Sequence, residues 1–190
     1  MDGRALAEVA REAVAGDATA LARLLDGLEP LVVRTTRLIV GPGTAQAEDA
    51  AQDALVDLAR GIAKLRDPEA VVAWAARIAT RRALRAARWE RLRRGREREL
   101  EAWVPEVRLD EGRRAALGSA FDRLPPRRRA TAVLRLYLGL SEAETAAVLG
   151  TSVGAVKSQL HAARAQLAQS LREAGVAPAT SAAVNTEGRR

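Results

Sequence analysis

Residues 140–167 read LSEAETAAVLGTSVGAVKSQLHAARAQL, which is two short helical patterns separated by a Leu-Gly-Thr turn. Ser141 and Glu144 have the spacing of a capping box, which predicts a helix that begins here and stops at Gly150. A second helix is predicted from about Ser152 to Glu173. These lengths are typical of a helix-turn-helix DNA reader. A helical hairpin within a bundle is the alternative interpretation.

The second of these helices has an apolar stripe that we expect to be buried, formed by Val153, Val156, Leu160, Ala163, Leu167 and Leu171. Lys157 and Arg164 on its free side suit phosphate contacts, whereas Ser158, Gln159 and His161 suit contacts to base edges. Thr151 and Ser152 stand at the helix start, where backbone amides and hydroxyls can hold a phosphate.

Upstream of this stretch, the chain divides into modules. Helices are predicted at 113–123 and 127–138, with Pro125-Pro126 between them and Gly139 after the second. Residues 95–112 have weak periodicity and follow a charge-dense segment, so they are predicted to be a linker. The expected boundaries are therefore 1–94 for a first domain, 95–112 for the linker, 113–173 for a second domain and 174–190 for a mobile tail.

The first domain is also predicted to be helical. Residues 4–40 suggest two or three helices with a break at Gly16-Asp17 and with Pro30 as a start or kink, and residues 41–44 form a loop. Helices at 47–62 and about 69–94 follow. The apolar residues are mostly Ala, Leu and Val, and no alternating strand pattern is present. The fold class is thus all-α: two small helical domains joined by a flexible linker, the second containing a helix-turn-helix.

The helix at 47–62 has an acidic outer face in a chain whose formal net charge is +7. Asp49, Gln52 and Asp53 lie on this face, opposite an apolar face of alanine, leucine and isoleucine. Acidic side chains repel DNA, so this face is expected to contact either solvent or a basic protein partner.

The long helix that follows carries an arginine stripe. Arg77, Arg81, Arg85 and Arg88 share one side, Trp74 stands at its beginning, and alanines occupy the opposite side. A basic stripe beside an aromatic ring suits a nucleic-acid strand, because it neutralises phosphates and offers a stacking surface. A solvated charged face with a buried tryptophan is the alternative.

Composition excludes several function classes. The chain has no cysteine and a single histidine, His161, so we expect no metal site, no cofactor and no catalytic dyad, and hence no enzyme. Of its 31 basic residues all but Lys64 and Lys157 are arginine, which favours a nucleic-acid partner over a membrane. With no signal peptide and no apolar run long enough to span a bilayer, a cytoplasmic protein without membrane insertion is expected.

Several segments together resemble the extracytoplasmic-function group of bacterial RNA polymerase sigma factors. Residues 47–55 (AEDAAQDAL) are similar to the family's acidic helix, and residues 73–79 (AWAARIA) match its W-x-x-R-I-A segment. Residues 124–129 and 139–144 are similar to the start of the family's second domain, and residues 152–160 (SVGAVKSQL) resemble its recognition helix. The resemblance covers about residues 18–173 except the linker.

The resemblance implies that the first domain binds core RNA polymerase through Asp49, Gln52 and Asp53 and that it reads and melts the minus-ten element with Trp74, Arg77, Arg81 and Arg85. It implies that the second domain reads the minus-thirty-five element through Thr151, Ser152, Lys157, Ser158, Gln159, His161 and Arg164. The partners would be core polymerase, promoter DNA and an anti-sigma factor, which family members commonly have. Ala155, Gln159 and Ala162 replace the family's usual Thr, Arg and Arg, which predicts shallow specificity.

Two other functions fit part of the pattern. A transcriptional regulator could use the helix-turn-helix with an N-terminal sensor or dimerisation domain, although the acidic helix followed by the arginine stripe argues against it. A helical adaptor that binds only proteins would lack the steep salt dependence of nucleic-acid binding.

Overall fold

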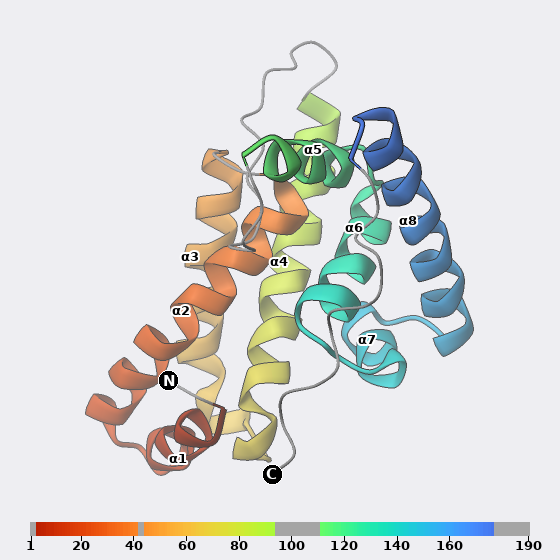
Figure 1. Ribbon diagram of the computed structural model, residues 1–190. Helices are drawn as coiled ribbons and strands as arrows, with labels where there is room; N and C mark the ends of the chain where they lie inside the picture. Colours follow the sequence, from red (N-terminus) through yellow and green to blue (C-terminus); the bar gives the residue numbers. More distant parts are fainter. Residues whose placement is uncertain (1–2, 42–43, 94–110, 177–190) are drawn as a thin grey trace, which may run out of the picture.

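The computed structural model describes residues 3–41, 44–93 and 111–176, and the regular elements of these ranges are all helical (Figure 1). The first module contains α1 (Gly3–Val14), α2 (Ala18–Val40), α3 (Ala45–Gly61) and α4 (Val71–Arg93), with the 3-10 turns η1 (Ile62–Lys64) and η2 (Pro68–Ala70) between α3 and α4. The second module contains α5 (Glu111–Asp122), α6 (Pro126–Ala132), the π-helical turn η3 (Val133–Tyr137), α7 (Glu142–Leu149) and α8 (Val153–Glu173). The predicted all-α fold with a helix-turn-helix in the second module is confirmed for these residues.

Local caps set the boundaries in the first module. The Asp17 carboxylate accepts hydrogen bonds from the amides of Thr19 and Ala20, which separates α1 from α2. The Thr44 hydroxyl accepts one from Ala47 N and starts α3. Each cap satisfies amides that have no partner inside the helix, and this is why these breaks are readable from the sequence.

Pro30 is not a helix start, which was one of the two predictions for it. It lies inside α2, which continues from Ala18 to Val40. The ring is exposed, so water can reach the carbonyl that loses its amide donor. Leu28 and Val32 on either side of it are fully buried, and this packing favours a continuous helix.

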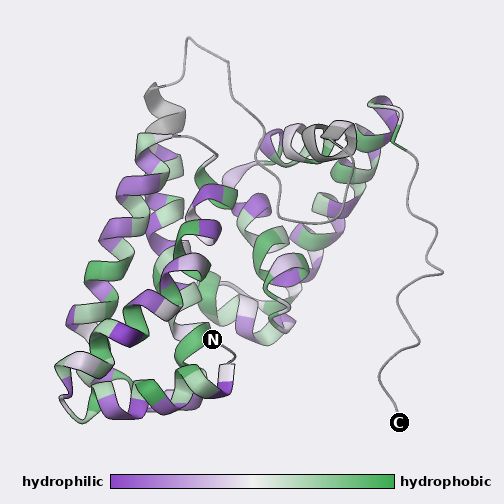
Figure 2. Cartoon of the chain, turned by 60° about the vertical axis from the view of Figure 1, so that its left-hand side comes forward, coloured by the Kyte–Doolittle hydropathy of each residue, from purple (hydrophilic) through white to green (hydrophobic). Residues whose placement is uncertain are grey.

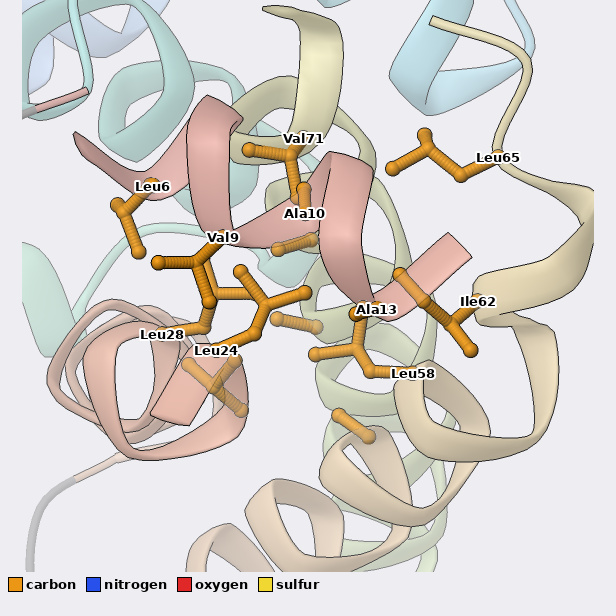
Figure 3. Close-up of a cluster of buried hydrophobic side chains, with 14 of the residues drawn as sticks. Leu6, Val9, Ala10, Ala13, Leu24, Leu28, Leu58, Ile62, Leu65 and Val71 are labelled. Carbon is orange, nitrogen blue, oxygen red and sulfur yellow. The ribbon is translucent and has the colours of Figure 1, made fainter. Parts of the chain in front are cut away.

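The core of the first module lies where α1 crosses the ends of the other three helices (Figure 1). Apolar side chains of α1, α2, α3, η1 and α4 converge there (Figure 3): Leu6, Val9, Ala10, Ala13, Leu24, Leu28, Leu58, Ile62 and Val71. The inner face of α4 is an alanine stripe with Ala75, Ala79 and Ala83 at 0% exposure. These short side chains let neighbouring helices approach α4 closely. Hydrophobic and hydrophilic residues alternate along the helices (Figure 2), as expected for helices with one buried and one exposed face.

The second module contains the predicted capping box. The Ser141 hydroxyl accepts from Glu144 N at 3.1 Å, and Glu144 Oε2 accepts from Ser141 N at 2.7 Å. Gly150 ends α7 in the left-handed conformation, with φ of 60°. The prediction of one helix over 127–138 is wrong in detail, because η3 follows α6 and its wider turn ends with Leu138 N donating to Val133 O.

The predicted linker, 95–112, falls almost wholly on residues outside the described ranges, as does most of the predicted tail, 174–190. Within the described ranges, the second module packs directly against the first. The helix α6 contacts both α2 and α4, and α7 contacts α4.

Candidate protein and nucleic-acid interfaces

The acidic surface lies on α3, where Asp49, Gln52 and Asp53 are all exposed. The opposite face of α3 is buried through Ala47, Ala51, Ala54 and Leu58, so the rotation of the helix is fixed. Glu48, at the edge of this surface, forms an ion pair of 3.6 Å with Arg37 of α2. The sequence therefore placed these three side chains correctly on an outward surface.

Arg82 of α4 holds the acidic helix against the arginine-bearing one. Its Nε and Nη2 donate to the two carboxylate oxygens of Asp57, both at 2.7 Å, and its Nη1 donates to Asp53 Oδ2 at 3.0 Å. The hydrogen bond from Arg82 lowers the pKa of Asp57, against a raising effect of burial, and the same bond raises the pKa of Arg82. A planar guanidinium can make this two-pronged contact, whereas a lysine cannot.

Sequence reasoning missed Arg82. It lies off the stripe of Arg77, Arg81 and Arg85, and the periodicity of α4 does not reveal a partner on another helix. Asp57, 25 residues away, is its partner. The contact could have been predicted from the acidic face of the helix at 47–62 and from the arginine of the next helix that lies outside the stripe.

The arginine stripe on α4 is exposed at Arg77, Arg81, Arg85 and Arg88. A hollow of about 130 Å³ opens between this stripe and α3, lined by Asp57, Ile78, Arg81, Arg82 and Arg85. With Asp57 paired to Arg82, Arg81 and Arg85 leave the hollow net positive. The geometry suits a phosphodiester or another anion next to an apolar wall.

Trp74 lies where the stripe begins, but its ring is half-buried and packs against the core of the first module. A methyl group added at Gly61 would lie 3.2 Å from Trp74 Cζ2, so the ring covers the end of α3 closely. Trp74 as a whole is only partly buried. The contact with the core is therefore observed, and a role of the ring in nucleic-acid binding stays a prediction.

In the helix-turn-helix, α8 is held by Val156, Leu160, Ala163 and Leu167, which are all buried. Val153 departs from the prediction, because its side chain is 40% exposed. Ser152 caps α8 by accepting from Ala155 N at 3.1 Å. The outward positions include most of the predicted DNA contacts: Ser152, Lys157, Ser158, His161 and Arg164.

Three of the predicted DNA-contacting residues have a partner within the module or reduced exposure. Gln159 is half-buried, and its Oε1 accepts from the Thr131 hydroxyl of α6 at 2.8 Å. Lys157 Nζ lies 3.6 Å from Glu142 Oε2, with the lysine side chain 64% exposed. Thr151 is half-buried beside the turn. The exposed set is thus smaller than the predicted set.

Other chemistries find no support in the described ranges. No group of three or more side chains suited to a metal ion gathers there. None of the helices in those ranges is both long enough and apolar enough to cross a membrane.

Two family models match the chain. The model for sigma-70 region 2 matches residues 24–93, and the model for sigma-70, region 4 matches residues 114–167. The first range contains α3 and α4, and the second contains the helix-turn-helix.

Curated relatives match most of the chain. The ECF RNA polymerase sigma factor SigD of Mycobacterium tuberculosis is 30% identical over 190 aligned residues, covering 92% of this chain and 88% of the relative. SigM, another ECF RNA polymerase sigma factor of the same organism, is 35% identical over 173 residues, covering 88% and 85%.

Solved structures share the fold. The sigma factor RpoE from Bartonella quintana, in complex with the anti-sigma factor NepR, has a TM-score of 0.65 at 22% identity and covers 80% of this chain and 96% of its own. CnrH, in complex with the cytosolic domain of CnrY, has a TM-score of 0.64 at 25% identity and covers 88% and 97%.

Proposed function

This chain belongs to the extracytoplasmic-function group of the sigma-70 family, and we propose that its surfaces divide the steps of transcription initiation between the two modules. The protein is a transcription initiation factor that binds core RNA polymerase and directs it to promoters. A helix-turn-helix regulator with a sensor domain is not favoured, because region 2 of the sigma family occupies residues 24–93, where a sensor would have to be.

The proposal rests mainly on the hydrogen bonds from Arg82 to Asp57 and Asp53, called here the Arg82 clamp. It holds α3, whose outer face is acidic, beside α4, whose outer face is an arginine stripe. One rigid bundle therefore presents an anionic and a cationic surface next to each other. Adjacent anionic and cationic surfaces suit a protein that binds a basic protein partner and a DNA strand at the same time.

Core polymerase is proposed to bind the acidic surface of α3 through Asp49, Gln52 and Asp53. Asp53 is bound to Arg82, yet its side chain is 63% exposed and can accept further donors. The double reversal Asp49→Arg and Asp53→Arg should weaken core binding at least tenfold, because it replaces attraction with repulsion.

A matched control exists on α2. Asp26 and Glu29 are also exposed acidic residues on a first-module helix, outside the proposed surface. Their double reversal changes the net charge equally and should leave core affinity within twofold. Equal losses in both double variants would show that net charge, and not this surface, governs binding.

The minus-ten element is proposed to lie along α4, with Arg77, Arg81 and Arg85 neutralising the phosphates of the opened strand. Trp74, which is only partly buried, is proposed to stack against a base. The variant Trp74→Leu keeps an apolar side chain for the core but removes the aromatic ring, so it tests the stacking role. A loss of open complexes at unchanged thermal stability supports stacking, and an unchanged yield contradicts it.

The minus-thirty-five element is proposed to lie against α8. Lys157, Arg164, Thr151 and Ser152 would hold phosphates, while Ser158 and His161 would contact base edges. Gln159 is also assigned to this site, with its bond to Thr131 setting how far its amide can extend.

The remaining assignments concern boundaries and partners. We assign residues 1–94 and 113–173 to the two functional domains and place the protein in the cytoplasm with core polymerase. An anti-sigma factor is a proposed partner, since the structurally similar sigma factor RpoE is in complex with the anti-sigma factor NepR.

Reconstituted transcription tests the function directly. Core polymerase plus this chain should initiate at a limited set of sites on fragmented genomic DNA, and mapping of those sites should give a shared upstream pattern. Binding to DNA without binding to core polymerase would instead indicate a regulator, and binding to core without any DNA dependence would indicate an adaptor.

A further inference from the structure

Two glutamines, about two turns apart, lie on the flank of α8 that faces α6 and the end of α5. The amide of Gln166 is used entirely within the module: its Oε1 accepts from Arg128 Nη1 at 2.9 Å, and its Nε2 donates to Arg123 O at 3.0 Å. The amide of Gln159 has one such contact among the described residues, in which its Oε1 accepts from the Thr131 hydroxyl at 2.8 Å. Gln166 therefore holds the helices together, whereas half of the Gln159 amide is available.

The Thr131 hydroxyl is a fixed partner for this amide. Thr131 lies in α6 and is 0% exposed, and its hydroxyl also lies 2.9 Å from the carbonyl oxygen of Arg127, one turn earlier in the same helix. A hydroxyl has one proton, so it can donate to only one of the two oxygens at a time. When it donates to Arg127 O, a half-turn of the Gln159 amide lets Nε2 donate to the hydroxyl. In both orientations Thr131 binds one polar atom of the amide and leaves the other free.

Half an amide cannot read a base as a whole amide does. A glutamine recognises adenine with two hydrogen bonds at once, because its oxygen accepts from N6 while its nitrogen donates to N7. A single bond is less selective, since guanine and thymine also present acceptors in the major groove and cytosine also presents a donor. The bond to Thr131 therefore removes the adenine preference that an unrestrained glutamine would have.

Gln159 lies where this restraint affects the DNA-facing side of α8. Its neighbours Val156 and Leu160 are buried, whereas Ser158 is exposed. Gln159 itself is half-buried, between the flank that meets α6 and the outward side. Once released from Thr131, its long side chain can extend towards the side on which Ser158 lies. This role rests on the proposed binding of the minus-thirty-five element by α8.

We propose that Thr131 is a specificity-determining residue that acts through Gln159. It binds one half of the glutamine amide and so prevents α8 from selecting adenine at the base pair that this side chain faces. Removal of the hydroxyl should then produce a gain of base preference. Loss of folding or of DNA affinity would not produce such a gain, so the two effects are separable.

Selection from upstream duplexes with randomised positions, carried out with the full-length chain and core polymerase, tests the gain. Thr131→Val replaces the hydroxyl with a methyl group and should create an adenine preference of about tenfold at one position, as expected for one bidentate contact. Adding Gln159→Ala to this variant should abolish the new preference. Thr131→Ser keeps the hydroxyl and should select the wild-type pattern.

Thr145→Val is the matched control. Thr145 lies in α7 of the same helix-turn-helix and is 0% exposed, and its hydroxyl has no hydrogen-bond partner among the described residues. This change also removes a buried hydroxyl, and the selected pattern should stay unchanged. The same adenine preference in Thr145→Val would show that a loosened module causes it, and the proposal would be wrong. Circular dichroism checks folding, and Thr131→Ala, which removes the same hydroxyl, is scored instead if Thr131→Val does not fold.

Nuclear magnetic resonance of the free chain tests the restraint without DNA. The side-chain amide signal of Gln159, identified by its loss in Gln159→Ala, should be rigid in the wild type and mobile in Thr131→Val. A mobile wild-type signal overturns the restraint, even if α8 binds upstream DNA. An upstream pattern that is identical in wild type and Thr131→Val overturns the effect on specificity. A rigid signal without any upstream pattern in the wild type overturns upstream recognition by α8 and, with it, this role of Thr131.

Discussion

Replacing Arg82 with methionine should lower the free energy of unfolding of the first module by about 1–2 kcal/mol. The change removes two bonds of 2.7 Å to Asp57 and one of 3.0 Å to Asp53. Bonds to charged groups contribute about 1.5–3 kcal/mol each when well buried. Here the Arg82 side chain is 26% exposed and that of Asp57 36%, so water screens the pair and rehydrates the remaining carboxylate. The three bonds together are therefore expected to contribute about as much free energy as one well-buried bond.

The loss should depend on pH in a definite direction. The hydrogen bond from Arg82 holds the pKa of Asp57 below its ordinary value, so the unfolded chain binds this proton more readily. The stabilisation is then complete above the unfolded pKa of about 3.9 and disappears as the pH falls through the lower, folded pKa. The difference between wild type and Arg82→Met should shrink steadily below about pH 4.

Urea unfolding followed by circular dichroism, at several pH values from 7 to 3, measures both effects. A double-mutant cycle with Asp57→Asn should give a coupling of about 1 kcal/mol at pH 7. Arg77→Met, an exposed change on the same helix, should stay within about 0.5 kcal/mol of wild type. A coupling below about 0.3 kcal/mol, or a loss that is the same at all pH values, would refute the clamp.

Three further outcomes follow from the described contacts. Arg77→Ala and Arg81→Ala should each reduce the salt slope of open-complex formation by about one unit, and an unchanged slope means that neither arginine meets a phosphate. In a selection from randomised upstream elements, Lys157→Ala should weaken all sequences about equally, whereas His161→Ala should relax one or two positions by about 1–3 kcal/mol; the assignment fails if both variants keep the wild-type preference. Gly150→Ala should destabilise the second module by about 1 kcal/mol, because φ is 60° there, and a melting temperature equal to wild type would contradict this strain.

The features predicted correctly from the sequence are local ones. The capping box of Ser141 and Glu144 and the break at Gly16-Asp17 depend on residues a few positions apart. Such features can be recognised in one sequence without knowing how the helices pack. The rotation of α3 and α4 also follows from spacing alone, because an apolar stripe must face the core. These features fix the fold class and the outward surfaces.

The features that were missed depend on distant residues. Periodicity cannot show that Arg82 reaches Asp57 or that Arg34 reaches Tyr137, because both pairs form only once helices pack. Pro30 is not a helix start, one of the two predictions made for it, because burial of its neighbours outweighs its weak helix propensity. Val153 fits the stripe by spacing, yet it is 40% exposed, and spacing alone does not show which positions of a stripe a neighbouring helix covers.

The recognition helix shows how these two kinds of information combine. The sequence indicates a less basic helix than the family's, with Ala155, Gln159 and Ala162 at three positions. In the structure both alanines are half-buried, and Gln159 is bound to Thr131 of α6 at 2.8 Å. This flank of α8 therefore packs within its own module and leaves few long side chains to reach base edges. Because phosphate contacts carry no sequence information, discrimination among upstream elements must depend on the remaining outward side chains and on DNA shape.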